Sequence, residues 1–524
     1  MIQNIRELVD VSAVKSPHKI AVKSEMAGVY TEKTFSDLKA DVLTFGNFLI
    51  NSYGDNVRLA LVGENSYHWI VSYFTALYFG WVLVPIDRDL STDDLMRIIQ
   101  ESDANVLSFG NTHAKKVDKL RNSLINVCSY VAMNTVENSF GCNMSDILSA
   151  RNERADMLCS IDATEIAMIM FTSGTTGTSK GIMLSQKNLL SNCISVADVL
   201  HLPEDSVGLG VLPFHHGLPS MCDLLVTNYV NGTLCINRSL RYLTDDIQQF
   251  KPTHIFAVPL IASTLIQKVN SVVNKMNLSN EARIDAIKNF FGGKLRTVLC
   301  GGAMISSEII SGYQEIGVKL IRGYGITECS PVVSVTFPDR DDYDAVTIGT
   351  PLACNRVKIV DGEICVSGDN VMKGYYKDPE ATATAFNGEW FLTGDLGYLD
   401  EKGDLYITGR KKNMIILDNG KNICPEEIED VLMRHDDVEE CVVLEYHQYS
   451  NSPAVIAAIV RLSDGCAAGS IATIISETNK NLPVYKRIEK YFLTEQEFEK
   501  TTTKKIIRSK VCERVLMEVN CNAK

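Results

Sequence analysis

Short apolar runs alternate with amphipathic stretches along much of the chain. Apolar runs bounded by turn residues predict buried strands, and apolar residues at helical spacing predict helices. The predicted strands are residues 57–63, 82–85, 106–109, 166–170, 182–184, 298–300 and 319–321, and the predicted helices are residues 67–79 and 93–101. This alternation favours an α/β fold, with mostly parallel sheets covered by helices on both faces.

The pattern changes near residues 406–416, where Gly409-Arg410-Lys411-Lys412 separates two strand-like runs. Beyond it, residues 425–435 predict a helix with an acidic first turn, and residues 441–444 and 455–460 predict strands. These elements are enough for a second compact domain of about 110 residues. The segment between the two runs is then either a domain hinge or a plain surface loop.

Composition narrows the class of partner. The chain has 524 residues, which is long enough for more than one domain, and its hydrophobic fraction of 45% is that of an ordinary globular protein. The net charge of −13 disfavours nucleic-acid binding and adsorption to anionic membranes, because both need clustered cationic side chains. We therefore expect small-molecule partners and no nucleic acid.

The cysteines and the N-terminal residues indicate the cellular compartment. The 15 cysteines form no C-x-x-C pair, and residues 1–11 lack a basic segment followed by an apolar run. No apolar stretch approaches the roughly 20 residues of a membrane span. These features predict a cytoplasmic protein without disulfides, structural zinc or a membrane span.

One segment carries more chemistry than any other. Between the strands predicted at 166–170 and 182–184 lies Phe171-Thr172-Ser173-Gly174-Thr175-Thr176-Gly177-Thr178-Ser179-Lys180-Gly181. Glycines let the backbone approach phosphate oxygens, hydroxyls and amides donate to them, and Lys180 adds a positive charge. A Walker loop needs Gly-Lys-Ser/Thr, but here Gly181 follows the lysine. A Gly/Ser/Thr linker is the alternative, but the string resembles the phosphate loop of the adenylate-forming superfamily, which includes acyl-CoA synthetases, luciferases and peptide-synthetase adenylation domains.

Further segments follow in the order that this superfamily uses. Arg322-Gly323-Tyr324-Gly325-Ile326-Thr327-Glu328 resembles its Y-G-x-T-E segment, and Gly301-Gly302-Ala303 resembles the segment that lines the adenine pocket. The resemblance implies that Tyr324 stacks on adenine, Thr327 contacts the α-phosphate and Glu328 helps to hold Mg²⁺. The residue types suit these roles, since a flat ring fits a purine and a carboxylate fits a hard cation.

The ribose contacts are implied in the same way. Trp390-Phe391-Leu392-Thr393-Gly394-Asp395 resembles the segment whose aspartate binds the ribose hydroxyls, and Arg410 would reach ribose or phosphate. Taken alone, either residue would be read as a surface charge. With these, the ATP-binding residues implied by the resemblance are Thr172, Ser173, Gly174, Thr175, Thr176, Gly177, Gly301, Gly302, Ala303, Tyr324, Gly325, Asp395 and Arg410.

Two segments near the C-terminus complete the resemblance. The one beginning Gly420-Lys421-Asn422 resembles a segment that faces the active site during thioester formation. Residues 500–508 resemble P-K-T-x-x-G-K-x-x-R, whose second lysine is catalytic, and this role falls on Lys505. Glu499 replaces the usual proline and Lys504 the usual glycine, so Lys504 is the alternative catalytic lysine. A solvated basic tail is the structural alternative.

The resemblance extends from Glu64 to Arg508 and implies the domain organisation. We expect a large N-terminal AMP-binding domain over residues 1–409, a hinge over residues 410–412 that turns about Lys412, and a small mobile α+β lid domain over residues 413–524.

The implied activity is an ATP-dependent acid–thiol ligase. A carboxylate does not react with a thiol directly because its leaving group is poor, so ATP would first convert it to an acyl-AMP. The resemblance implies that Lys180 and Mg²⁺ neutralise the departing pyrophosphate and that Lys505 bridges carboxylate and α-phosphate. A thiol then displaces AMP. CoA is the expected acceptor, and an acyl carrier protein is the alternative. A catalytically silent nucleotide-binding protein is a different function that the sequence leaves open, and the motifs also do not exclude luciferase-like oxygenation.

The acid is predicted from residues 211–218, Val-Leu-Pro-Phe-His-His-Gly-Leu, which contain no carboxylate for a substrate ammonium. The segment resembles L-P-x-x-H of fatty acyl-CoA synthetases, so His216 and Gly217 are expected beside the acyl pocket. Zinc or a general base is the less favoured reading of the histidine pair, since no further ligands or triad partners are evident. We expect a medium- or long-chain fatty acid, as in the bacterial long-chain synthetases that the chain resembles.

Overall fold

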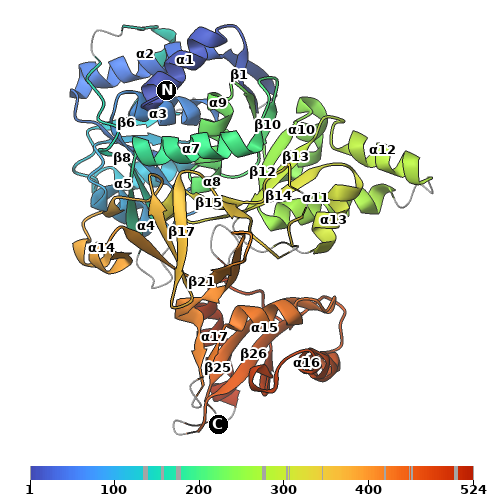
Figure 1. Ribbon diagram of the computed structural model, residues 1–524. Helices are drawn as coiled ribbons and strands as arrows, with labels where there is room; N and C mark the ends of the chain where they lie inside the picture. Colours follow the sequence, from blue (N-terminus) through green and yellow to red (C-terminus); the bar gives the residue numbers. More distant parts are fainter. Residues whose placement is uncertain are drawn as a thin grey trace.

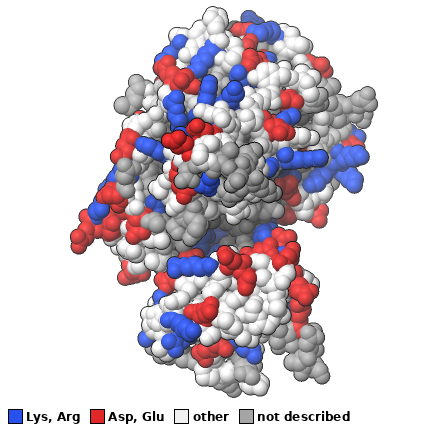
Figure 2. Space-filling view, turned by 90° about the vertical axis from the view of Figure 1, so that its right-hand side faces the viewer, with Lys and Arg blue, Asp and Glu red and all other residues white. Residues whose placement is uncertain are grey.

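The structure is a computed structural model that describes residues 2–522 apart from 27, 134–139, 155–157, 173–178, 274–278, 302–304, 306, 341, 345, 418–420, 448, 450–451 and 501–505. Figure 1 shows a large N-terminal part, coloured blue to yellow-orange, above a small C-terminal part in orange and red. On the face shown in Figure 2, basic and acidic side chains are interspersed over both parts. Among the described residues, no helix has the length and apolar character needed to cross a membrane.

One eight-stranded sheet forms around β3 and β4. Its strand order is β19-β9-β8-β4-β3-β5-β6-β7, parallel from β8 to β7 and antiparallel at the other edge. The strands are β3 (Arg58–Val62), β4 (Val82–Ile86), β5 (Val106–Phe109), β6 (Ser129–Ala132), β7 (Cys142–Asn143), β8 (Ile166–Thr172), β9 (Lys180–Ser185) and β19 (Gly374–Tyr375). Its central strands are apolar on both faces, as expected of strands covered by helices.

A nine-stranded sheet lies beside it, in the order β16-β15-β14-β13-β12-β10-β11-β1-β2. Its six central strands, from β14 to β1, are parallel. The strands are β1 (Ile20–Met26), β2 (Val29–Thr34), β10 (Val207–Gly210), β11 (Thr233–Ile236), β12 (His254–Ala257), β13 (Thr297–Gly301), β14 (Lys319–Gly325), β15 (Val332–Val335) and β16 (Thr350–Pro351).

One apolar core joins the two large sheets. Helix α3 (Tyr67–Tyr78) is apolar on nearly all sides and is buried, and Trp69 on it packs against Phe214, which follows β10, with ring centroids 5.6 Å apart. The other helices of this part are α1 (Ile5–Lys15), α2 (Phe35–Tyr53), α4 (Thr92–Glu101), α5 (Ala114–Leu120), α6 (Met144–Ser149), α7 (Gln186–Leu200), α8 (Gly217–Pro219), α9 (Thr227–Tyr229), α10 (Leu243–Phe250), α11 (Pro259–Val273), α12 (Asn280–Phe290), α13 (Ser307–Glu315) and α14 (Pro379–Ala385).

A third, antiparallel sheet leads to the C-terminal part. It contains β17 (Asn355–Val360), β18 (Glu363–Gly368), β20 (Phe386–Asn387), β21 (Trp390–Leu399) and β22 (Leu405–Arg410). The Asn188 side chain, at the start of α7, donates to the carbonyls of Asp369 and Val371, each at 2.8 Å. These bonds hold the link between β18 and β19 against the larger sheets.

The C-terminal part has its own apolar clusters. It contains the two-stranded pair β23 (Ile415–Ile416) and β24 (Asn422–Ile423) and the sheet of β25 (Val438–Tyr446), β26 (Val455–Leu462) and β27 (Lys490–Leu493). Its helices are α15 (Pro425–Leu432), α16 (Ile471–Lys480) and α17 (Arg508–Asn522). The prediction of a large α/β part and a small α+β part is confirmed, whereas the antiparallel third sheet was not predicted.

Candidate active site

The predicted adenine and ribose residues lie together. Tyr324 is at the end of β14, and its hydroxyl donates a 2.6 Å hydrogen bond to Asp395 Oδ2. Asp395 on β21 is paired across the ladder with Arg410 on β22, and Arg410 Nε lies 2.9 Å from Asp395 Oδ1. The Asp395 side chain is 3% exposed and that of Arg410 is 43% exposed. A buried carboxylate held from both sides in this way has a fixed orientation.

The predicted metal and phosphate residues meet at one tyrosine. The Tyr375 hydroxyl donates to Glu328 Oε1 at 3.2 Å, and Lys180 Nζ lies 4.7 Å from the centroid of the Tyr375 ring. Burial raises the pKa of Glu328, and the hydrogen bond from Tyr375 opposes that rise. A partly desolvated carboxylate gains from a hard cation, so the donor set fits Mg²⁺.

Two glycines allow close backbone approach at this edge. A Cβ on Gly325 would lie 2.3 Å from the Pro331 carbonyl oxygen, so only glycine fits where β14 turns into the 3-10 helix of Thr327–Cys329. Gly301 ends β13, where it pairs with Gly323 of the neighbouring parallel strand. The adenine segment and the Thr327 segment thus follow adjacent parallel strands at their carboxyl ends, where α/β sheets bind ligands.

The eight-stranded sheet also contributes the carboxyl ends of its strands to the candidate site. Thr172 ends β8 and pairs with Lys180 at the start of β9, so both flank the phosphate loop. Asp87 directly follows β4, the parallel neighbour of β8. The phosphate-loop ends and Asp87 therefore lie along the same edge.

The segment predicted to line the acyl pocket is held by Asn65. Its side-chain amide donates to the Leu212 carbonyl at 2.7 Å and accepts from the Phe214 amide at 2.9 Å. His216 directly precedes α8, and a Cβ on Gly217 would contact Pro331 at 3.4 Å. The segment therefore packs beside the turn that follows Glu328.

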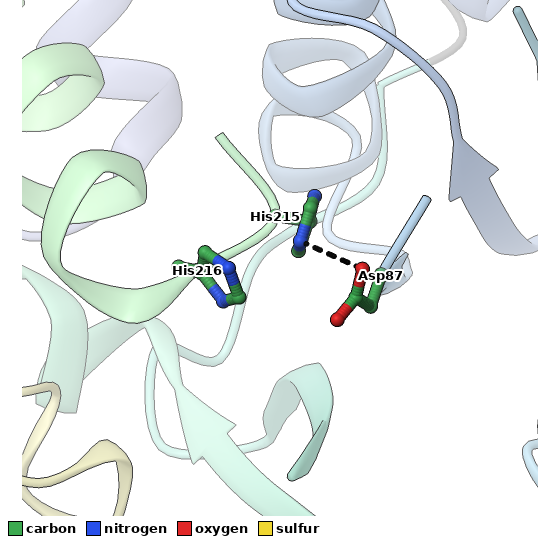
Figure 3. Close-up of side chains that lie close together, drawn as sticks. All are labelled: Asp87, His215 and His216. Atoms are coloured by element: carbon green, nitrogen blue, oxygen red, sulfur yellow. Dashed lines mark ion pairs between the residues drawn. The ribbon is translucent and has the colours of Figure 1, made fainter. Parts of the chain in front are cut away.

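The neighbouring histidine has an acidic partner. His215 Nε2 lies 3.3 Å from Asp87 Oδ1, and the rings of His215 and His216 are 4.1 Å apart between centroids. Figure 3 shows these three side chains grouped together. The expectation that residues 211–218 offer no acid holds for the segment itself, but the fold brings Asp87 to it from β4.

The predicted hinge, residues 410–412, begins at the last residue of β22. Lys412 lies in the 3-10 helix Lys411–Asn413, where burial lowers its pKa to about 8. Asn413 Nδ2 donates to Glu426 Oε1 at 2.6 Å, which links this turn to α15. The role of Lys412 as a pivot stays a prediction, as do the domain boundaries.

The predicted thioester segment lies in part within the described residues. Lys421 Nζ is 3.9 Å from the Tyr485 ring centroid, and Asn422 begins β24. Cys424, further along this segment, packs on β22, the strand that leads into the hinge, because a Cβ on Gly409 would lie 2.9 Å from Cys424 Cβ. The end of the thioester segment therefore contacts the strand that carries Arg410.

The predicted catalytic lysine lies in a segment whose two ends are fixed. Lys500 and Ile506 form an antiparallel bridge, and Lys500 Nζ contacts Glu440 at 2.7 Å. Beyond the segment, Arg508 forms an ion pair with Glu429 of α15. Several predicted site residues lie outside the described residues: Ser173, Gly174, Thr175, Thr176, Gly177, Gly302, Ala303, Gly420, Lys504 and Lys505.

Sequence reasoning missed the positions of Tyr375 and Asp87. No predicted site segment includes Tyr375, and its position between Glu328 and Lys180 depends on the pairing of β19 with β9. Asp87 had no motif around it. Its only signal was its place after a predicted buried strand, which is where the carboxyl edge of a parallel sheet carries polar ligands.

Comparison with known proteins places the chain in a family. An AMP-binding enzyme family model matches residues 9–376, and a model of the AMP-binding enzyme C-terminal domain matches residues 427–505. The fold and the grouped Tyr324, Asp395, Arg410 and Glu328 agree with a nucleotide-binding ligase. The protein belongs to the AMP-binding enzyme family, and the predicted resemblance to the adenylate-forming superfamily is confirmed.

Relatives within this family act on different acids. Rat long-chain-fatty-acid–CoA ligase 5 is 28% identical over 438 residues, which cover 72% of this chain and 63% of that ligase. Feruloyl-CoA synthase from an Amycolatopsis species is 29% identical over 446 residues, covering 82% of this chain and 83% of that enzyme. The chain thus spans less than two thirds of the rat ligase.

A solved structure shares the whole fold. The anthranilate CoA ligase AuaEII, in complex with anthranoyl-AMP, superposes with a TM-score of 0.85 at 20% identity and covers 99% of this chain and 98% of that ligase. At this identity the likeness concerns the fold and not the acid that is bound.

Proposed function

We propose that the protein is an ATP-dependent ligase that activates a medium- or long-chain fatty acid as an acyl-AMP and transfers the acyl group to CoA. The main support is the arrangement of Tyr324, Asp395 and Arg410 near Glu328, which Tyr375 connects to Lys180. It offers a ring for adenine, a fixed carboxylate for the ribose hydroxyls, and a carboxylate and a cation for the phosphates.

In the first half-reaction, a substrate carboxylate oxygen attacks the α-phosphorus of ATP and pyrophosphate leaves. Thr327 would contact the α-phosphate, and Lys180, beside the phosphate loop, would neutralise charge on the leaving group. Glu328 would hold Mg²⁺, which supplies further charge neutralisation when bound. Lys505 would bridge the carboxylate and the α-phosphate as negative charge develops there.

In the second half-reaction, the CoA thiol attacks the acyl carbonyl and AMP leaves. We propose that the lid domain, residues 413–524, turns about Lys412 relative to residues 1–409, within the hinge at 410–412. This turn would remove Lys505 and present Gly420, Lys421 and Asn422. The packing of Cys424 on Gly409 supports a lid whose thioester segment can lie beside the hinge strand.

The choice of a fatty acid depends on the segment at Leu212 to Leu218. The segment itself carries no carboxylate, and Asp87, which the fold brings beside it, already faces His215 Nε2 at 3.3 Å. An unpaired substrate ammonium would be costly to bury there, whereas an alkyl chain would not. The likeness to a long-chain-fatty-acid–CoA ligase agrees with this choice, and the likeness to a feruloyl-CoA synthase makes an aromatic acid its main competitor.

One experiment tests the function directly. The protein is incubated with ATP, Mg²⁺ and a panel of fatty, aromatic and amino acids, with either CoA or an acyl carrier protein, and the products are identified by mass spectrometry. We expect AMP and fatty acyl-CoA. Products only with carrier protein would replace CoA as the acceptor, aromatic thioesters would replace the fatty acid, and the absence of AMP with every acid would favour a silent nucleotide-binding protein.

A further inference from the structure

The proposed ligase chemistry makes no use of the pair of Asp87 and His215. Asp87 comes from the end of β4 in the eight-stranded sheet, whereas His215 and His216 follow β10 in the nine-stranded sheet. One nitrogen or oxygen of each side chain lies within 4.8 Å of one from each of the others. Side chains from two sheets are thus grouped at one point (Figure 3).

The distance between His215 and Asp87 is long for a charge-assisted hydrogen bond. A charge-assisted N–H···O bond spans about 2.7–2.9 Å, whereas His215 Nε2 and Asp87 Oδ1 are 3.3 Å apart. His215 is 5% exposed, and its Nε2 has no hydrogen-bond partner in the part of the chain that the structure describes. Burying a polar nitrogen beside a carboxylate without a hydrogen bond between them costs free energy, unless both groups bind a common partner.

The same distance suits two ligands of one metal ion. Zinc binds imidazole nitrogen and carboxylate oxygen at about 2.0–2.2 Å, so two ligands at a tetrahedral angle are about 3.3–3.5 Å apart. Imidazole with carboxylate is a donor set for zinc and similar divalent transition ions rather than for Mg²⁺ or Ca²⁺. We propose that Asp87, His215 and His216 bind a divalent transition-metal ion of the zinc type.

The surroundings hold two of these ligands in place. Asp87 Oδ1 accepts a 2.9 Å hydrogen bond from the Asp89 amide, and the Asn65 side chain clamps the backbone at Leu212 and Phe214 just before the histidines. Such outer contacts orient ligands and commonly change metal affinity by about 10–100-fold. The site would join the two large sheets, so bound metal would stabilise the fold.

Three protein ligands leave one tetrahedral position open, as in zinc sites that exchange water for another ligand. Because His216 adjoins Gly217 and the Pro331 turn, this position would lie near the substrate side of the proposed active site. The metal site stands on its own observations and does not depend on the ligase function.

Cobalt(II) titration of the full-length, reduced and chelator-treated protein tests the site. We expect one equivalent to bind with visible d–d bands and without the near-ultraviolet band of a cobalt–thiolate bond, which separates this site from the cysteines. Zinc should displace the cobalt and raise the melting temperature, since it binds the folded state. Asp87→Asn, His215→Ala and His216→Ala should each weaken binding at least tenfold.

The chain offers a matched control in His447, which lies 2.9 Å from Glu445 in the C-terminal part. His447→Ala should bind cobalt as the unaltered protein does. If the buried His215→Ala fails to fold, the more exposed His216→Ala and Asp87→Asn decide the matter, with circular dichroism as the check on folding. Failure of the unaltered protein to bind one equivalent of cobalt would overturn the proposal and leave a metal-free Asp–His pair. So would binding by folded Asp87→Asn and His216→Ala that is as tight as that of the unaltered protein.

Discussion

The Tyr324 hydroxyl donates a 2.6 Å hydrogen bond to Asp395, although the two residues are 71 positions apart in the chain. Sequence motifs assign adenine to one and ribose to the other. The bond makes the ring and the carboxylate a single rigid unit, since both side chains are buried. The nucleotide would therefore meet an orientation that is set before it binds.

Removing this hydroxyl should weaken ATP binding. A hydrogen bond to a charged group contributes about 1.5–3 kcal/mol, so Tyr324→Phe should raise the KM for ATP roughly tenfold or more, with a smaller change in kcat. Initial rates against ATP concentration measure this. Tyr398→Phe is the control, because Tyr398 is 48% exposed and stacks on Tyr406. An unchanged KM in Tyr324→Phe would show that Asp395 needs no such support.

Tyr375 should affect the magnesium requirement. Tyr375→Phe keeps the ring near Lys180 but removes the donor to Glu328, so the Glu328 pKa should rise further and adenylate formation should need several-fold more Mg²⁺. Tyr375→Leu should also raise the KM for ATP, because a cation–π contact contributes about 0.5–2 kcal/mol. Pyrophosphate exchange at varied Mg²⁺ measures both effects.

The adjacent Tyr376 provides the control for the substitutions at Tyr375. Its hydroxyl donates to Asp103 at 2.7 Å, away from Glu328, so Tyr376→Phe should leave the Mg²⁺ requirement unchanged. Identical magnesium curves for Tyr375→Phe and Tyr376→Phe would rule out the role given to Tyr375.

Lys505→Ala should reduce adenylate formation by about 10²-fold or more, because it removes a charge from the developing transition state. The thioester half-reaction from supplied acyl-AMP should be largely kept. Each half-reaction is assayed separately, and Lys504→Ala is the control. Loss in both half-reactions contradicts the role, and a normal Lys505→Ala with an inactive Lys504→Ala moves it by one residue.

Substrate selectivity should follow chain length. Each methylene that enters an apolar pocket contributes up to about 0.8 kcal/mol, so kcat/KM should rise up to about fourfold per carbon across saturated acids until the pocket ends. Steady-state kinetics over the series measures the profile, and ferulate is the aromatic comparison. A flat profile, or a best substrate with an α-amino group, excludes the fatty-acid assignment.

Stability should depend on pH through Glu429. Burial raises its pKa from 4.5 to about 7, against the opposing charge of Arg508. The folded state then holds a proton that the unfolded state loses, so this contribution to stability is present below pH 4.5 and falls as pH rises towards about 7. Glu429→Gln should remove this pH dependence. Its free energy of unfolding should exceed that of the unaltered protein by up to about 3 kcal/mol between pH 5 and 8.

Denaturant unfolding at several pH values measures this difference. Glu439→Gln is the control, because the Glu439 side chain is 43% exposed and lies 3.0 Å from Arg461. A difference between Glu429→Gln and the unaltered protein that stays constant with pH would contradict the assignment.

Most of the large sheets could be predicted from the chain. The runs at 57–63, 82–85 and 106–109 became β3, β4 and β5, because strands buried on both faces are continuously apolar. The third sheet was missed, since strands such as β17 are only partly buried and lack such a run. Its position depends on distant contacts, including those from Asn188.

The sequence alone determined the α/β class, the family and the residue types of the candidate nucleotide site, because glycines, hydroxyls and charges at fixed spacing follow from local backbone and phosphate chemistry. Tertiary structure alone decided that Tyr375 lies between Glu328 and Lys180 and that Asp87 lies beside His215. Those contacts join residues on different strands. They depend on the pairing of β19 with β9 and on how two sheets pack, and no local pattern encodes either.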